Sequence, residues 1–229
     1  MTESLQKIKE TLKNWPLMVR KYQKSCKKIA TQQIITSLLP FIGITILAYL
    51  VYPHSKTAAI LLGFINSLFL IRIFIIQHDC GHQSFFKSKK WNNFWGRICS
   101  FLSIMPYKNW LDSHNYHHAH NGDLDFREMG DMELLTVAEY QKKSYWGKIL
   151  YRFMRSKISI LLFSPLTYLF VINRVGYLSF KNLKKRILGL SFYNLGLVIL
   201  FGGLMYFFGW QKVTLIHLSI LIPFAILAF

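Results

Sequence analysis

The sequence predicts an all-α integral membrane protein made of two transmembrane hairpins, four spans in all, with a helical cap between them. Of its 229 residues 52% are hydrophobic and 16% aromatic, which is too apolar for an ordinary soluble domain. Long segments with almost no charge could each cross a bilayer, and they are residues 34–52, 57–77, 188–210 and 213–229. Most of the eight histidines fall in two groups within residues 78–120, between the hairpins.

Residues 1–33 are expected to form a basic arm in front of a membrane domain at 34–229. The arm has no apolar core followed by a small-residue cleavage site, so it is not a signal peptide. Its apolar residues at helical spacing are Leu5, Ile8, Leu12 and Trp15. That spacing predicts an amphipathic helix on an anionic membrane surface, and a solvated tail is the alternative.

The first hairpin is expected to turn at Pro53 and His54, which follow the uncharged run 34–52. The second span, 57–77, then ends directly before His78. Residues 94–105 are apolar but too short to span, so they predict an interfacial or re-entrant helix.

The segment after the second histidine group begins with an acidic tract between Asp123 and Glu133, which predicts a loop. Thr136 and Glu139 then have the spacing of a capping box that opens a short helix. Residues 158–172 are apolar but short and contain Pro165, and we expect them not to cross. The second hairpin is expected to turn at residues 210–212.

The distribution of basic residues predicts the orientation. All but three of the 28 lysines and arginines lie in residues 1–33, 78–157 and 173–187, the exceptions being Lys56, Arg72 and Lys212. The positive-inside rule places those three segments, and so both histidine groups, in the cytoplasm. The formal net charge of +18 does not indicate a nucleic-acid partner, because the basic residues flank spans and form no stripe interleaved with aromatic residues.

The spacing of the histidines predicts a metal site in the cap. His78 and His82 are four residues apart, so on a helix they share one face. His114, His117 and His118 have the spacing i, i+3 and i+4, which also gives one face. Five imidazoles on two facing helices suit iron, copper, nickel or zinc rather than magnesium or calcium. The alternative is five unrelated surface histidines.

Other residues narrow the kind of metal chemistry. A zinc protease would have a glutamate after its first histidine, where this chain has Asp79. A structural zinc site would use paired cysteines, whereas Cys26, Cys80 and Cys99 are scattered singly and predict no disulfide. Many imidazoles with few carboxylate ligands are typical of non-haem iron that activates oxygen.

Both histidine groups resemble the first two histidine boxes of the membrane fatty acid desaturases. His78-Asp79-Cys80-Gly81-His82 followed by Ser84-Phe85-Phe86 is similar to the acyl-lipid, delta-12/omega-3-like branch. The second box is His114-Asn115-Tyr116-His117-His118. The tract from Gly122 to Tyr140 is also similar to bacterial members of that branch.

The resemblance implies a cofactor, a reaction and partners. It implies two non-haem iron ions, with His78, His82, His114, His117 and His118 as metal ligands and no catalytic residues beyond them. The reaction would place a double bond in a lipid-linked acyl chain, with O2 as co-substrate and two electrons from ferredoxin or a cytochrome b5-like protein. Metal-bound imidazoles commonly donate to a carboxylate, and the candidates are Asp79, Asp112, Asp123 and Asp125.

The chain departs from the family in lacking a third histidine box. Of the remaining histidines, His54 is expected to be a surface residue and His217 a helix contact, and His120 is more simply a spare polar residue than a sixth ligand. The apolar run up to Phe229 has no polar flank, so the membrane domain is expected to be incomplete at its C-terminus. We expect the native chain to continue into a third cluster, and residues 1–229 alone to hold metal weakly without turnover.

Three alternative functions remain open from the sequence. A lipid hydroxylase or a carotenoid oxygenase of the same superfamily would use similar boxes. An inactive truncated relative would carry the boxes without turnover. A bis-histidine haem electron-transfer membrane protein would need facing histidines within spans, whereas these lie at span ends.

Overall fold

The computed structural model describes residues 11, 13–15, 17–20, 24–126, 134–175 and 183–228. Within these ranges every regular element is a helix and no strand occurs. The all-α class predicted from the sequence is therefore confirmed. The first ten residues, which include Leu5 and Ile8, together with Leu12 and the part of the acidic tract at 127–133, lie outside the described residues. The surface helix of the arm thus stays a prediction.

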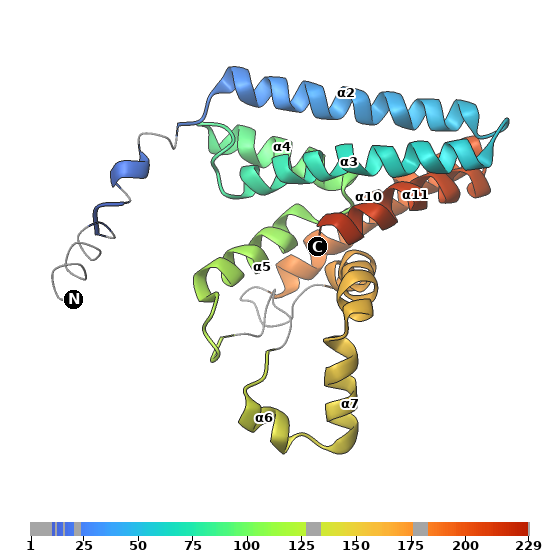
Figure 1. Ribbon diagram of the computed structural model, residues 1–229. Coiled ribbons are helices and arrows are strands. Elements are labelled where there is room, and N and C mark those ends of the chain that lie inside the picture. The colour runs from blue at the N-terminus through green and yellow to red at the C-terminus, as the bar shows by residue number, and fades with distance from the viewer. Residues whose placement is uncertain are drawn as a thin grey trace.

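Four helices are long and apolar enough to cross a membrane. They are α2 (Lys27–Val51), α3 (Lys56–Gly81), the part Arg186–Phe208 of α10 (Leu183–Phe208), and α11 (Trp210–Ala228). Figure 1 shows α2 and α3 side by side as one hairpin and α10 followed by α11 as the other. All four expected spans are confirmed. The first begins earlier than expected, because the helix already starts at Lys27, inside the segment that was predicted as an arm.

The turn of the second hairpin was predicted one residue too late. The chain reverses at Gly209, and Trp210 already begins α11. The φ angle of Gly209 is 85°, in the left-handed region that glycine adopts without steric cost. Glycine in this conformation commonly ends a helix, so a single residue suffices for the turn.

Helix α3 is the centre of the packing, since α2, α4 and α11 all contact it. Its Asn66 is fully buried and donates from Nδ2 to the carbonyl oxygen of Phe41 at 3.0 Å and to Oγ1 of Thr45 at 2.9 Å. Three residues earlier in α3, a Cβ at Gly63 would lie 1.8 Å from Oγ of Ser219. Only glycine therefore allows α11 to approach α3 this closely. These contacts fix the rotation of α3 about its own axis.

Helices α4 (Lys89–Leu102) and α5 (Tyr107–His120) follow α3 and are joined by a short loop. Neither is among the helices long enough to span, in agreement with the prediction for 94–105, although α4 starts earlier, at Lys89. The loop is tied to α3 by Gln77, which donates to the carbonyl oxygen of Met105 at 3.2 Å and accepts from Ser103 at 2.7 Å. The end of α3 and the start of α5 are thereby held together.

The segment between α5 and α10 contains short helices, with α6 (Val137–Lys142) and α7 (Tyr145–Met154) first. The predicted capping box at α6 is present, because Thr136 and Glu139 satisfy each other's backbone N–H groups. Next come the π-helices η1 (Ser159–Phe163) and η2 (Tyr168–Ile172) around α8 (Ser164–Thr167), and then α9 (Asn173–Val175).

The run from η1 to η2 forms a 62° bend with α7. By length and composition the bent pair could be a broken fifth span or a re-entrant loop. That residues 158–172 do not cross therefore stays a prediction. In the view of Figure 1, α7 runs across the direction of α2 and α3.

Candidate metal centre

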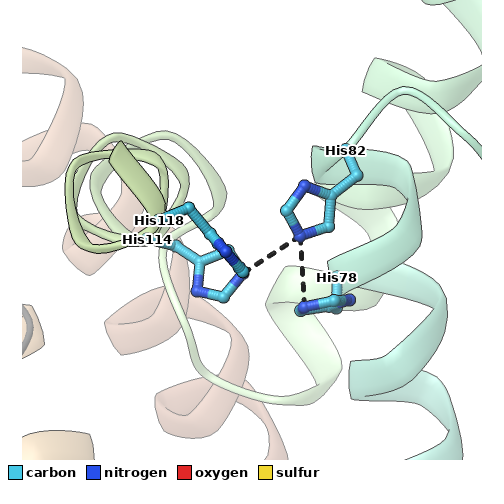
Figure 2. Close-up of side chains that lie close together, drawn as sticks. All are labelled: His78, His82, His114 and His118. Atoms are coloured by element: carbon cyan, nitrogen blue, oxygen red, sulfur yellow. Dashed lines mark hydrogen bonds between the residues drawn. The ribbon is translucent and has the colours of Figure 1, made fainter. Parts of the chain in front are cut away.

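Four of the five histidines that the sequence singled out meet at the end of α3. His78 lies in the last turn of α3 and His82 directly follows it, while His114 and His118 project from α5. One ring nitrogen from each lies within 4.8 Å of all the others. Figure 2 shows the two pairs of imidazoles pointing toward each other across the gap between the helices.

The contacts within this four-histidine cluster are between Nε2 atoms. His82 Nε2 lies 3.3 Å from that of His78 and 3.1 Å from that of His114, and His118 Nε2 lies 3.1 Å from that of His114. A neutral imidazole nitrogen either carries a proton or offers a lone pair, but not both. A chain of three such contacts therefore cannot be made of ordinary single hydrogen bonds. A cation between the rings would accept all four lone pairs at once, so the donor set fits a metal ion.

Close packing of α5 against the end of α3 brings the two pairs together. A Cβ at Gly81 would lie 3.0 Å from the Trp110 ring and 3.1 Å from the Leu111 side chain, so a larger residue between Cys80 and His82 would force these two side chains of α5 to give way. Gln83 then ends α3 with a φ angle of 57°, the left-handed conformation that commonly follows a helix.

Trp110 forms the floor of the cluster and was missed by the sequence reasoning. Its ring stacks on the His114 ring, with centroids 4.6 Å apart and planes 18° from parallel. The centroid of the His78 ring lies 5.7 Å from that of Trp110. Only 4% of Trp110 is exposed. The available signal was its position four residues before His114, since residues i and i+4 share a helix face.

Of the four carboxylate candidates, only Asp79 contacts a cluster histidine in the described residues. Its Oδ1 lies 3.1 Å from Nδ1 of His78. A carboxylate at Nδ1 holds the proton on that nitrogen, which leaves the Nε2 lone pair available to a metal. The side chain of His78 is thus oriented toward the cluster.

The other carboxylates have different roles from the one expected for them. Asp112 accepts from Lys108 at 2.9 Å and from Arg186 at 2.6 Å, and so ties α5 to the start of α10. Asp123 accepts from the backbone N–H of Asp125 at 3.0 Å, which closes a turn. The expectation of a histidine partner was therefore wrong for Asp112 and Asp123, because nearer cations or backbone groups compete for their oxygens.

His117 and His120 are outside the four-histidine cluster. The ring centroid of His117 lies 5.8 Å from that of His118, on the neighbouring side of α5. His120 Nδ1 lies 3.0 Å from the carbonyl oxygen of Tyr116, and its ring stacks on the Tyr116 ring at 4.2 Å. His120 is therefore engaged in local packing.

The remaining histidines lie away from the cluster. His54 is exposed in the turn between α2 and α3. His217 lies in α11, where its Nε2 is 3.1 Å from the hydroxyl of Tyr49 in α2. That bond makes His217 a contact between helices, as its position in a span predicted. The three cysteines Cys26, Cys80 and Cys99 are free thiols.

Two histidines of the cluster are held neutral by their surroundings. Burial, and then the neighbouring imidazoles His78 and His118, lower the pKa of His82. The same causes, burial first, lower the pKa of His114 to about 4. A neutral imidazole is the form that binds metal, so at neutral pH these two rings are already in the ligand state.

The chain resembles known proteins of one family. The family model described as "Fatty acid desaturase" matches residues 55–229. A fatty acid desaturase of Bacillus subtilis (strain 168) is 36% identical over 185 residues, 81% of this chain and 52% of that protein. An sn-1 acyl-lipid omega-3 desaturase (ferredoxin) of Synechocystis is 36% identical over 78 residues, 34% of this chain and 21% of that protein.

A third relative is an sn-1 oleoyl-lipid 12-desaturase of Anabaena variabilis, 31% identical over 119 residues, which are 52% of this chain and 32% of the relative. These matches span about half the length of the relatives or less. No solved structure matches the chain.

Proposed function

The chain belongs to the fatty acid desaturase family, and from this premise we propose that it is an O2-dependent oxidoreductase that introduces a double bond into a lipid-linked acyl chain. The observation that carries the proposal is the cluster of His78, His82, His114 and His118 at the end of a membrane-spanning helix. Such a site lies where a candidate membrane span ends, beside the bilayer that would hold the acyl chain.

The proposed cofactor is a pair of non-haem iron ions. One ion would be held by the four-histidine cluster, whose nitrogen-only donor set suits a first-row transition metal. The second would use His117, the remaining box histidine, together with further donors. When bound, the irons would activate O2, which supplies the oxidising power that no side chain has.

The reaction would remove one hydrogen from each of two adjacent methylene carbons. O2 takes up these two hydrogens, two further protons and two electrons, and leaves as two water molecules, while a carbon–carbon double bond forms. The box histidines would hold the irons. Asp79 would fix the tautomer of His78 through its contact with Nδ1, and burial would keep the rings of His82 and His114 neutral.

The proposed substrate is a membrane lipid, and the proposed electron donor is ferredoxin or a cytochrome b5-like protein. Two relatives have names that specify an sn-1 acyl lipid and ferredoxin. By similarity to those relatives, we propose the same class of lipid substrate and the same class of electron donor for this chain. A ferredoxin would have to reach the cluster from the cytoplasm, if the cluster lies on the side that the distribution of basic residues predicts.

Product analysis in living cells tests the function. The native protein that carries this sequence and residues 1–229 alone are each expressed in bacteria that lack a desaturase, and the membrane fatty acids are analysed by gas chromatography and mass spectrometry. A new unsaturated acyl chain that the native protein makes, and that disappears with His82→Ala, supports the proposal, while residues 1–229 alone are expected to give none. A hydroxylated lipid or an oxidised carotenoid would instead show another reaction of the same superfamily, and no new product from the native protein together with full iron loading would refute an enzymatic role.

The cytoplasmic side of the cluster is a separate proposal with its own test. Single cysteines introduced at His54 and at Lys143, in a variant without the native cysteines, are labelled in intact cells with a membrane-impermeant reagent. Position 54 should be labelled and position 143 protected. The opposite pattern would reverse the orientation.

A further inference from the structure

A groove of about 670 Å³ lies between α3 and α11, at the end of the molecule that carries the turns of both hairpins. It runs along the first turns of α3 and the outer two-thirds of α11. Its apolar lining includes Ile60, Phe64, Leu215, Leu218, Ile222 and Pro223. Ile60, Phe64 and Leu218 are among the exposed large apolar side chains, so the groove is open to the bilayer.

Aromatic and basic side chains gather at the mouth of the groove. Tyr52, Lys56, Trp210 and Gln211 line it there. The Lys56 ammonium lies 6.0 Å from the centroid of the Tyr52 ring, and the Lys212 ammonium lies 5.7 Å from the same centroid. Two cations are therefore held on one ring, at the level where tyrosine and tryptophan mark the membrane interface.

No carboxylate of the neighbouring helices balances these two cations. The segments 34–77 and 188–228, which form both hairpins up to the histidines, contain no aspartate or glutamate. A basic pair at a bilayer surface without acidic neighbours attracts anionic headgroups. The charge at the mouth and the apolar lining behind it are complementary to one kind of molecule, an anionic lipid.

The groove is separate from the metal centre. Lys56 begins α3 and His78 lies in its last turn. At 1.5 Å per residue, the helix holds them about 33 Å apart, roughly the thickness of the hydrocarbon core. A lipid seated in the groove therefore has its headgroup at the opposite membrane surface from the four-histidine cluster, and it is not a substrate in position to react.

We propose that this groove is a binding site for an anionic phospholipid. Its phosphate lies between Lys56 and Lys212, with the Gln211 amide as a further donor, and one acyl chain fills the space between Phe64 and Ile222. The lipid bridges the two hairpins at the end that carries their turns. The site does not depend on the proposed function, since none of its residues contacts the cluster.

Photo-crosslinking tests the site. The full chain is reconstituted in phosphatidylcholine vesicles that contain a trace of either phosphatidylglycerol or phosphatidylcholine with a photoreactive group in the acyl chain. Labelled peptides are identified by mass spectrometry. Peptides of α3 and α11 that contain Phe64 and Ile222 should be labelled about thirtyfold more by the phosphatidylglycerol probe. This is the preference expected when each of two lysines contributes about 1 kcal/mol of attraction to an anionic headgroup, since about 1.4 kcal/mol corresponds to a factor of ten.

Variants separate specific binding from general contact with the bilayer. Lys56→Gln/Lys212→Gln should reduce the phosphatidylglycerol labelling of the groove to the level of phosphatidylcholine, and Lys56→Arg/Lys212→Arg should keep it. The control is Lys89→Gln/Lys90→Gln, which removes the same charge from exposed positions on α4 and should not change groove labelling. Equal labelling of the wild-type groove by both probes, or full labelling of the glutamine pair, would overturn the proposal.

Discussion

The indole ring of Trp110 is stacked on the imidazole of His114, 18° from parallel and 4.6 Å between centroids. The same ring contacts His78 on the other helix and presses against Gly81. One buried side chain therefore sets the distance between both halves of the four-histidine cluster. Its removal should disturb metal binding although it supplies no ligand.

Trp110→Ala should lower the iron content of the purified protein severalfold and reduce its stability by about 3–5 kcal/mol, the usual cost of a large aromatic cavity. Trp110→Phe should keep most of the iron content and most of the stability, because a phenyl ring can still stack on His114. Iron is measured by elemental analysis and stability by thermal unfolding in detergent. Unchanged iron content in the alanine variant would show that α5 is positioned by other contacts.

In the native protein that carries this sequence, replacement of any one of the cluster histidines by alanine should abolish metal binding at the cluster and lipid desaturation while membrane insertion remains normal. The matched control is His54→Ala, because His54 is exposed in a turn away from the cluster. Iron content, membrane fractionation and product analysis are measured together. Full activity in cells with His82→Ala would remove the cluster from the proposed site.

His117→Ala should behave differently from the four cluster variants. Because His117 is outside the cluster, this variant of the native protein should keep one bound ion and lose the second, with loss of desaturation. Iron stoichiometry and electron paramagnetic resonance distinguish a single ion from a coupled pair. A His117→Ala protein with full desaturase activity would contradict the assignment of His117 as a ligand.

Asp79→Asn should weaken metal binding about 10- to 100-fold, the range typical for loss of a carboxylate behind a metal-bound histidine. The amide cannot hold the Nδ1 proton of His78 as the carboxylate does at 3.1 Å. Asp125→Asn is the control, since Asp125 is exposed beyond the second box. Competition with a metal-chelating dye measures the affinity, and equal values for both variants would exclude the proposed role of Asp79.

The metal-free protein should lose stability as the pH falls. A histidine in an unfolded chain titrates near about 6.5, whereas His114 in the fold has a pKa of about 4. Between these values the unfolded state binds a proton that the folded state does not, so the free energy of unfolding decreases from about pH 6.5 down to about pH 4. The melting temperature should fall less steeply with decreasing pH in His114→Gln than in the unchanged protein. An identical pH dependence would contradict the lowered pKa of His114.

The spans and the spacing of both boxes were readable from the sequence because each depends on a local pattern. Which histidines meet was not, since that depends on how closely α5 approaches α3. His118 lies about 40° around the helix from His114 and His117 about 60° in the other direction, by the 100° turn of each residue. The approach of α3 falls on the side of His118. The contact between Gly81 and Trp110 that decides this side has no periodic signal.

Local sequence patterns could not predict most partners of the carboxylates either. Asp79 could be matched to His78 because the residues are adjacent. The partner of Asp112 is Arg186, which is distant in the sequence and reaches α5 only through the packing of α10. The turn at Gly209 was misplaced for a simpler reason, since a glycine with positive φ needs no neighbouring turn residues.

The close approach of Gly63 to Ser219 and the bonds of Asn66 lock the rotation of α3 near its start, while His78 and His82 must face α5 at its end. Both conditions fall on one uninterrupted helix, so the number of residues between them sets the direction in which His78 and His82 face. Inserting or deleting a single residue after Asn66 would swing the first box about 100° away from the second without altering any ligand. Only length changes near whole multiples of a turn would make the two boxes face each other again, and those would shift the first box along the helix axis by about 5 Å per turn.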